Sequence, residues 1–258
     1  MLRKLLLLPL VSSTVSAATF MSDFTVDNGG FNTAITGTTL TEMNGELTFS
    51  PDNQNQGAAI EINPSQLLGV TNTQADPLFF DFTFLAPDLS TGEELVVFFG
   101  EGSQSGFTFA FEGDSSLIAV GNNDQSTVLL EDLEAGQTVN FQVEFFALAN
   151  GAQPLTLGNT TVSGGQNPGQ INTAAFVIAS TLDQTSDVEL IAGATNLNSG
   201  QINDFTFQGI STQSNSGTIT SFTVSDEPIS IPTPIPEPSS AALLLLAGSS
   251  LLLRRKRA

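Results

Sequence analysis

The sequence contains no cysteine, histidine, tryptophan or tyrosine, and only 6 of its 258 residues are lysine or arginine. Without cysteine the chain has no disulfide and no thiolate metal site. Without histidine it cannot build a Ser-His-Asp triad or a histidine-based zinc site. Carboxylates, hydroxyls, amides and the backbone are the groups that remain for binding or chemistry.

The basic residues are confined to the two ends of the chain, whereas all 26 acidic residues lie between them. The basic residues are Arg3, Lys4, Arg254, Arg255, Lys256 and Arg257. Because binding to phosphates depends on lysine and arginine, this distribution excludes nucleic acid as a partner of the body. The acidic excess indicates repulsion and solubility in an exported protein, with a dedicated cation-binding role as the alternative.

Residues 1–17 are typical of a signal peptide. A positively charged start is followed by the apolar stretch Leu5–Val11 and by the small-residue stretch Ser12–Ala18, which suits signal peptidase. The pattern allows cleavage after Ala17 or after Ala18. A retained anchor is disfavoured because the apolar stretch is too short to span a bilayer. We expect export through the inner membrane.

Residues 18–225 have the pattern of short β-strands, without a long amphipathic helix. Phe107–Phe111 alternates with period two, and Leu78–Leu85 and Thr138–Leu148 are similarly rich in phenylalanine. Asn44-Gly45 and Asn150-Gly151 predict hairpin turns. About twelve to fourteen strands are expected. The pattern predicts an all-β domain, an antiparallel two-sheet sandwich of jelly-roll type; the alternative, a β-helix, would need a fixed short repeat.

The C-terminal part begins with a proline-rich linker at 226–235, which favours an extended spacer. Pro236-Glu237-Pro238 follows, then the apolar segment Ser239–Leu253, then the basic cluster Arg254–Arg257. A helix over the apolar segment would be about 22 Å long against a hydrocarbon core of roughly 30 Å, so spanning would require snorkelling arginines or a thinned bilayer. The basic cluster should stop transfer and stay cytoplasmic, which places the acidic body outside.

These three elements, in this order over residues 236–258, resemble the PEP-CTERM sorting signal of exported bacterial proteins. The motif Pro236, Glu237 and Pro238, the hydrophobic helix and the basic tail all match that signal. The resemblance implies recognition by an exosortase, a membrane cysteine transpeptidase that removes the tail. It also implies transient membrane anchoring, followed by delivery to the cell surface or the extracellular polysaccharide matrix.

The body resembles, more loosely, the concanavalin A-like and LamG-like jelly rolls. Phe20–Thr25, Asn140–Phe146 and Ile202–Phe207 carry this resemblance, and none of the three is a diagnostic motif. Jelly rolls of this type often bind sugars and often hold a structural calcium ion. Such roles depend on particular sites rather than on the fold.

Two acidic pairs are candidates for carboxylate catalysis, which needs carboxylates about 5–10 Å apart. Asp187 and Glu189 are expected on one face of a strand, and Glu112 and Asp114 form the second pair. Solvated strand faces or turns are the simpler explanation, because the Glu-x-Asp-x-x-Glu pattern of laminarinase-like jelly-roll hydrolases is absent. We therefore expect a protein that is not an enzyme and has no catalytic residues.

Calcium is the metal that these residue types favour, since it binds oxygen ligands. Asp23 and Asp204 lie on expected terminal strands that could be neighbours, so they are the first candidates for a structural Ca²⁺ site. Asn122-Asn123-Asp124 is a weaker candidate. For all of these residues, a role in turns or strand ends is the alternative.

Two functions stay open at this point. One is a structural or adhesive protein of the cell surface or matrix, and the other is a carbohydrate-binding, lectin-like module that binds exopolysaccharide. All 20 aromatic residues are phenylalanine, which is typical of a core. Sugar contacts would therefore depend on amides and carboxylates in loops such as Thr160–Gln170.

The mass of the intact protein recovered from cells or medium tests the two processing predictions together. We expect a species that begins near Ala18 and ends near Pro238, because signal peptidase and exosortase remove the terminal segments. A species that retains Ser239–Ala258 would contradict removal of the tail and would indicate simple membrane anchoring.

Overall fold

A computed structural model describes residues 19–25, 31–33, 35–53, 57–61, 77–101, 105–120, 126–193, 197–198, 210–212 and 215–228. The chain divides into two compact units, Met1–Pro228 and Ile229–Ala258, and the described residues belong to the first. Both predicted terminal helices and the sorting motif lie outside the described residues. Within the described ranges every regular element is a strand, and no helix is long and apolar enough to cross a membrane.

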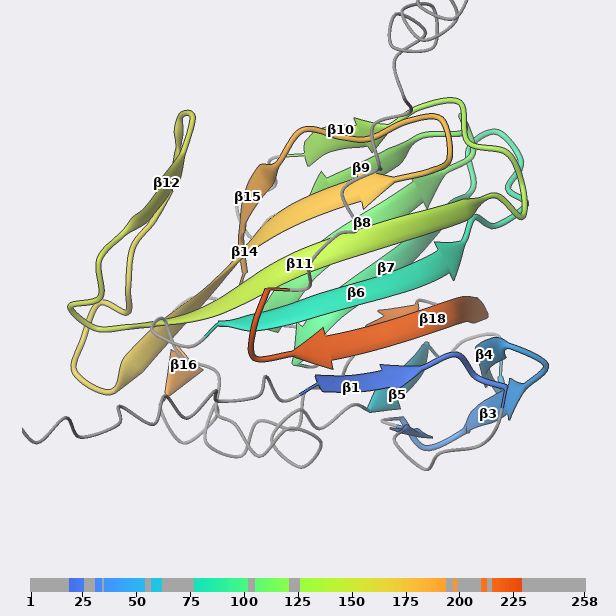
Figure 1. Cartoon of the computed structure of the whole chain (residues 1–258), viewed down its shortest axis with the longest axis horizontal. Helices are drawn as coiled ribbons and strands as arrows, with labels where there is room; N and C mark the ends of the chain where they lie inside the picture. Colours follow the sequence, from blue (N-terminus) through green and yellow to red (C-terminus); the bar gives the residue numbers. More distant parts are fainter. Residues whose placement is uncertain are drawn as a thin grey trace, which may run out of the picture. The chain divides into compact units, whose positions relative to one another are not determined.

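The larger sheet has nine antiparallel strands. They are β1 (Thr19–Ser22), β3 (Thr38–Met43), β4 (Glu46–Pro51), β6 (Leu78–Leu85), β11 (Thr138–Ala149), β14 (Gln170–Ser180), β15 (Glu189–Ala192), β16 (Leu197–Asn198) and β18 (Gly217–Ser225). The order is β15-β14-β11-β6-β18-β4-β3, with β1 paired to β18 and β16 paired to β14. The long strands β14, β11, β6 and β18 form its centre (Figure 1).

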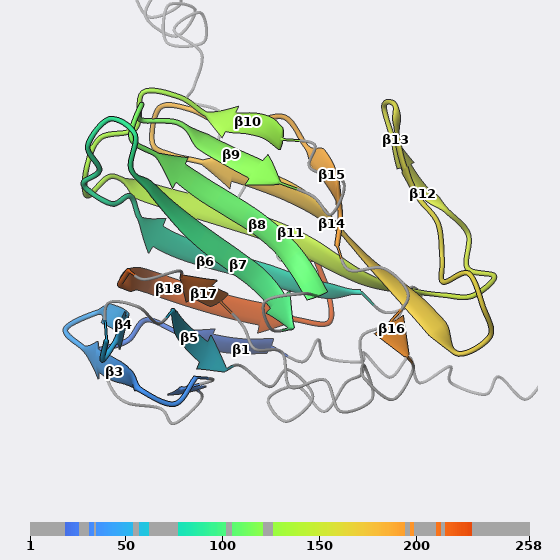
Figure 2. The ribbon, with the colours of Figure 1, turned by 180° about the vertical axis from the view of Figure 1, so that it is seen from behind.

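The second sheet has seven strands; it lies behind the first in Figure 1 and faces the viewer in the reversed view of Figure 2. They are β2 (Asn32–Thr33), β5 (Ala58–Glu61), β7 (Glu94–Glu101), β8 (Ser105–Glu112), β9 (Leu117–Val120), β10 (Ser126–Leu130) and β17 (Ile210–Thr212). The order is β10-β9-β8-β7-β17-β5-β2. A separate hairpin, β12 (Leu155–Leu157) and β13 (Thr160–Val162), projects from the body between β11 and β14.

Phenylalanine rings fill the space between the two sheets. Phe82 and Phe141 on neighbouring strands of the larger sheet stack with ring centroids 4.9 Å apart. Across the interface, the Phe109 ring lies 4.7 Å from the ring of Phe141. The largest fully buried side chains are Phe24, Phe49, Phe80, Phe82, Phe84, Phe107, Phe109, Phe141, Phe145 and Phe222. The predicted all-β antiparallel fold is confirmed, and the period-two alternation explains it because every second residue faces this core.

The hairpin turns predicted by Asn-Gly pairs are confirmed. Asn44 (φ 57°) and Gly45 (φ 84°) join β3 to β4, and positive φ at both central residues is what a two-residue hairpin turn requires. Asn150 and Gly151 form the turn that ends β11. Asparagine and glycine tolerate the left-handed region better than other residues do, so local sequence determines these turns.

The prediction that Thr160–Gln170 is a loop is wrong at both of its ends. Thr160–Val162 forms β13, and Gln170 begins β14. Val162 is 5% exposed because it packs on a second apolar cluster with Phe146 and Leu148, on the outer face of the larger sheet. Burial of this apolar side chain stabilises a strand where glycine and asparagine neighbours suggested a turn.

Truncation at the centre of the core should strongly destabilise the fold. We expect Phe141→Ala to lower the free energy of unfolding by about 3–5 kcal/mol, because it leaves a cavity between the two sheets. Urea unfolding of the purified protein measures this. Leu182→Ala is the control, since Leu182 is 96% exposed, and it should change stability by less than about 0.5 kcal/mol. Equal effects of the two substitutions would contradict the proposed core.

Candidate functional site

Asp23, a predicted calcium ligand, lies in the turn after β1 rather than on the strand. Its carboxylate accepts hydrogen bonds from the Thr25 hydroxyl (2.8 Å) and the Thr25 backbone N–H (3.1 Å). These two bonds lower the pKa of Asp23. Hydrogen bonds to an aspartate from the residue two positions later are ordinary in turns, which is the alternative role that the sequence left open for Asp23. Asp204 and Asn122–Asp124 lie outside the described residues, as do Ala17, Ala18, Pro236, Glu237, Pro238, Arg254, Arg255, Lys256 and Arg257.

The two acidic pairs considered for catalysis lie at strand ends and in turns. Asp187 precedes β15, which begins at Glu189, so the prediction that both residues share a strand is wrong. Glu112 ends β8, and Asp114 lies in the following turn. The Ser116 hydroxyl is within hydrogen-bond distance of both carboxylates, at 3.2 Å from Glu112 and 2.7 Å from Asp114. These contacts stabilise the turn between β8 and β9.

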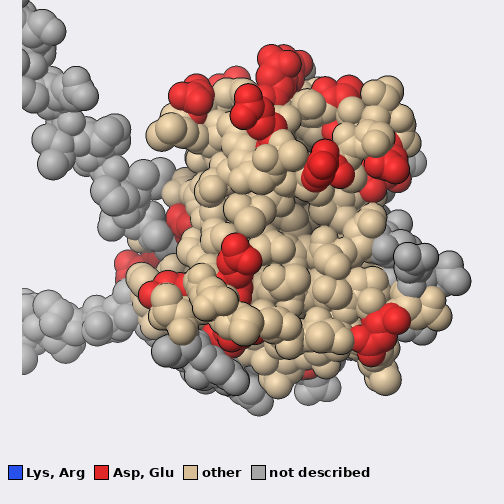
Figure 3. Space-filling view, turned by 90° about the vertical axis from the view of Figure 1, so that its right-hand side faces the viewer, with Lys and Arg blue, Asp and Glu red and all other residues tan. Residues whose placement is uncertain are grey.

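Exposed carboxylates lie on several strand connections at one end of the sandwich. Figure 3 shows scattered Asp and Glu side chains there, with no Lys or Arg among the residues described on that face. The connections between β6 and β7, β8 and β9, β10 and β11, and β14 and β15 carry Asp88, Glu93, Asp114, Glu131, Asp132, Glu134, Asp183 and Asp187. Among the described residues no three His, Cys, Asp or Glu side chains form a group that could hold a metal ion.

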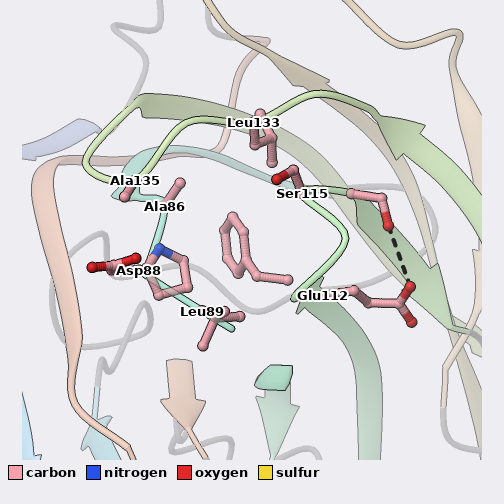
Figure 4. Close-up of a pocket in the computed structure, with 10 residues that line it drawn as sticks. Ala86, Asp88, Leu89, Glu112, Ser115, Leu133 and Ala135 are labelled. Atoms are coloured by element: carbon pink, nitrogen blue, oxygen red, sulfur yellow. Dashed lines mark hydrogen bonds between the residues drawn. The ribbon is translucent and has the colours of Figure 1, made fainter. Parts of the chain in front are cut away.

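A pocket of about 110 Å³ opens among these connections. Its lining residues are Ala86, Pro87, Asp88, Leu89, Phe111, Glu112, Ser115, Ser116, Leu133 and Ala135. In Figure 4, Asp88 and Glu112 lie on opposite sides of it, with Leu89 and Leu133 between. Glu112 is held by the hydrogen bond to Ser116, so this carboxylate already has a partner within the turn.

A row of polar side chains covers the outer face of the larger sheet at its centre. We call it the polar face; it comprises Asp81, Thr83, Asn140, Gln142, Glu144, Ser221 and Thr223. The inner neighbours of these residues on the same strands, such as Phe80, Phe82 and Phe141, are no more than 1% exposed. Because side chains alternate along a strand, burial of the phenylalanines directs the polar residues outward.

Hydrogen bonds connect the polar face across three strands. The Thr83 hydroxyl of β6 donates to the amide oxygen of Asn140 on β11 (3.1 Å) and lies 2.8 Å from the Ser221 hydroxyl of β18. Gln142 donates from its amide nitrogen to Asp81 at 3.3 Å, and Asn140 also hydrogen-bonds to the Asp81 carboxylate. The register pairs Thr83 with Asn140 and Asp81 with Gln142, so these groups are held in place by the backbone ladder.

Two carboxylates of the polar face have raised pKa values. Burial raises the pKa of Asp81, and the hydrogen bonds from Gln142 and Asn140 oppose that shift only in part. Burial alone raises the pKa of Glu144. Because Asp81 pairs with Gln142 and Glu144 is two residues further along β11, the two carboxylates are diagonal neighbours on adjacent strands.

Aromatic side chains border the polar face on the side of Glu144. Glu144 is directly opposite Phe79 on β6 and directly opposite Phe176 on β14. Phe176 also packs edge-on against Phe146, with centroids 5.7 Å apart, in the cluster covered by the β12–β13 hairpin. The hairpin is tied to the sheet by Asn172, which donates to the Ser163 carbonyl at 2.8 Å. The polar face is therefore bordered by aromatic side chains near Glu144, and the β12–β13 hairpin covers the neighbouring apolar cluster.

The polar face was not identified from the sequence, although part of its signal was present. In Phe80–Phe84 and Val139–Val143, polar residues alternate with apolar ones, which places each set on the outer face of its own strand. Strand β6 pairs with β11 on one side and with β18 on the other, and both strands are distant from it in the sequence. Alternation does not reveal such pairings, so the meeting of Asp81 with Asn140 and Gln142 was not predictable.

No family model matches the sequence, and no curated protein matches it. Among solved structures, a protein of unknown function from Shewanella oneidensis MR-1 is 10% identical, with a TM-score of 0.44, and the match covers 85% of this chain and 92% of that one. The VIP36 exoplasmic/lumenal domain, bound to Ca²⁺ and Man3GlcNAc, is 10% identical with a TM-score of 0.40 and coverages of 79% and 85%.

A bifunctional GH43-CE protein from Bacteroides eggerthii is 11% identical with a TM-score of 0.42; the match covers 81% of this chain but 27% of that one. All three TM-scores are below 0.5. These similarities therefore assign neither a family, a ligand nor an activity to the chain, and the candidate site depends on its own geometry.

Replacing Glu144 should make the protein more stable at neutral pH. With its pKa raised by burial, the protonated form stabilises the fold below the ordinary value of 4.5, and that contribution is lost as the pH rises through the folded-state value. Glu144→Gln mimics the protonated form. We expect its melting temperature to exceed that of the wild type by about 1–2 °C at pH 7, a small shift because the group is partly exposed.

The difference in melting temperature should shrink as the pH falls and vanish below pH 4.5. Glu46→Gln, at an exposed position of β4, is the matched control because it removes the same charge. A gain of the same size in the control would mean that general repulsion, rather than burial of Glu144, determines the effect.

Proposed function

We propose that this chain is an exported protein of the cell surface or extracellular matrix, processed by an exosortase, with a non-catalytic structural or adhesive β-sandwich. The observation that carries the proposal is the distribution of charge. Every lysine and arginine lies in a terminal segment that resembles a sorting signal, and the intervening body is purely acidic. Its partners during biogenesis are signal peptidase, the exosortase and, before processing, the membrane.

The chemistry of the body favours a non-catalytic role. Glu112 and Asp114 share a serine donor in a turn, and Asp187 lies off the strand that carries Glu189. Both arrangements serve local structure. Between the terminal segments the sequence has no histidine, cysteine, lysine or tyrosine, so the bases that commonly activate a serine or threonine nucleophile are missing there.

The acidic surface suits an adhesive role that depends on cations. Copies of the body repel one another because they carry charge of one sign, and divalent ions such as Ca²⁺ are the mediators that oxygen-rich surfaces bind. Asp23 and Asp204 stay the proposed residues for a structural calcium ion. Association of this kind should weaken broadly with chelator and with monovalent salt.

A second candidate function is carbohydrate binding, on the jelly-roll type of sandwich that the sequence predicts, and the polar face favours it. Asn140, Gln142 and Asp81 present amide and carboxylate groups that are already positioned by hydrogen bonds across two strands. Such groups match the hydroxyls of a sugar, and positioning in advance lowers the entropic cost of binding. Phe79 and Phe176 at the border supply apolar surface for a sugar ring. We propose this face, rather than the Thr160–Gln170 loop, as the glycan-binding surface.

A glycan array probed with the processed protein tests the second function. We expect retention of at least one oligosaccharide, and Gln142→Ala should weaken that interaction about fivefold through loss of one hydrogen-bonding group. Asn159→Ala is the matched control, because Asn159 is an exposed amide in the turn between β12 and β13. Absence of retention, or equal losses in the two variants, would count against sugar binding at the polar face. Full loss with chelator and no competition by any sugar would favour the cation-dependent role.

A further inference from the structure

Glu144 occupies an unusual position on the outer face of the larger sheet. Its two cross-strand neighbours are phenylalanines, Phe79 on β6 and Phe176 on β14. Directly opposed residues have Cβ atoms about 4.5–5.5 Å apart, so both rings are within reach of the carboxylate. All three side chains are half-buried and therefore still accessible from outside.

The Glu144 carboxylate lacks a partner within the described part of the chain. No hydrogen bond reaches it there, in contrast to Asp81, which is held by Gln142 and Asn140. Desolvation raises its pKa with no compensating contact. A half-buried carboxylate without a donor is unfavourable, and the cost is offset when a cation or a donor binds. The chain has no lysine or arginine between its terminal segments that could supply one.

The surroundings of Glu144 indicate the chemistry of a partner. The faces of aromatic rings attract cations, and the rings also pack against the apolar face of a sugar. Asp81 lies diagonally across from Glu144 on the same face, so a second carboxylate reinforces the preference for positive charge. Anionic groups, such as uronic acids or sulfates, would meet two carboxylates and be rejected.

We propose that Phe79, Glu144 and Phe176, with Asp81 beside them, form a subsite for a protonated amino sugar, a hexosamine with a free amine, within a polysaccharide. This proposal rests on glycan binding at the polar face. The ammonium group pairs with Glu144 and contacts the phenyl rings, while the sugar ring packs on one of those rings. The amides of Gln142 and Asn140 then contact hydroxyls of the adjoining sugar.

Titration calorimetry with the processed protein and two matched tetrasaccharides tests the subsite. The probes are a tetramer of glucosamine and a tetramer of N-acetylglucosamine. The amines of the first carry positive charge when protonated, whereas the acetylated nitrogens of the second carry none. We expect the wild type to bind the glucosamine tetramer at least tenfold more tightly, the scale expected of a charge-assisted hydrogen bond. Glu144→Gln should abolish this preference, so that the two tetramers bind with equal and weak affinity. Phe79→Leu, which removes a ring but retains an apolar side chain, should weaken both.

Three controls separate this subsite from general attraction to an acidic protein. Glu46→Gln removes the same charge from an exposed position, and equal losses in this variant would overturn the proposal. Spermine tests a cation without a sugar, and binding as tight as that of the glucosamine tetramer, with the same dependence on Glu144, would overturn the assignment to a sugar. Equal binding of both tetramers, unaffected by Glu144→Gln, would overturn the subsite but leave glycan binding intact. If neither tetramer binds and the glycan array is also empty, the proposed glycan-binding function itself fails.

Discussion

The layer of phenylalanine rings between the two sheets is the constraint on which the rest of the structure depends. Phe141 stacks on Phe82 within one sheet and contacts Phe109 of the other, so a single ring joins both layers. Because each buried ring takes an inward position, the residue beside it on the strand must face outward. The polar face is therefore a consequence of the core: Asp81 lies between Phe80 and Phe82, and the burial of those rings fixes its direction.

In the part of the chain that the structure describes there is no lysine or arginine, so carboxylates there have no salt bridge to these residues. Small hydroxyl and amide side chains take that role nearby: Thr25 donates to Asp23, Thr39 donates to Asp52 at 2.6 Å, and Gln142 donates to Asp81. These bonds are short-range and stay effective when the ionic strength is high, whereas long-range attraction between exposed charges is screened. Glu144 has no such hydrogen bond among the described residues, and its position between Phe79 and Phe176 makes it a candidate for binding a ligand rather than for stabilising the fold.

The sequence was sufficient to predict individual strands and turns. It was insufficient to predict which strands pair with one another. Alternation predicted Leu78–Leu85 and Thr138–Leu148 almost to the residue, and Asn44-Gly45 predicted its hairpin, since these features depend on local chemistry. The strand Thr160–Val162 was missed because it is stabilised by burial on Phe146 and Leu148, which are distant contacts rather than local propensity. The polar face was missed for the same reason. Its residues come from β6, β11 and β18, and their register depends on pairing across 138 positions between Thr83 and Ser221.

The two candidate functions are less separate than they first look. Bodies with carboxylates and no basic residues repel one another, so adhesion between copies needs a mediator of positive charge. Divalent ions are one such mediator, and a polysaccharide that carries free amines would be another. A polymer of the second kind would engage Glu144 on one molecule and the same site on the next, and the gain from multiple attachment would exceed the affinity of any one subsite. The polar face would then give an acidic protein a specific route to adhesion, because a positively charged polymer would pair with the Glu144 carboxylate more strongly than a neutral polymer and an anionic polymer would be repelled by it.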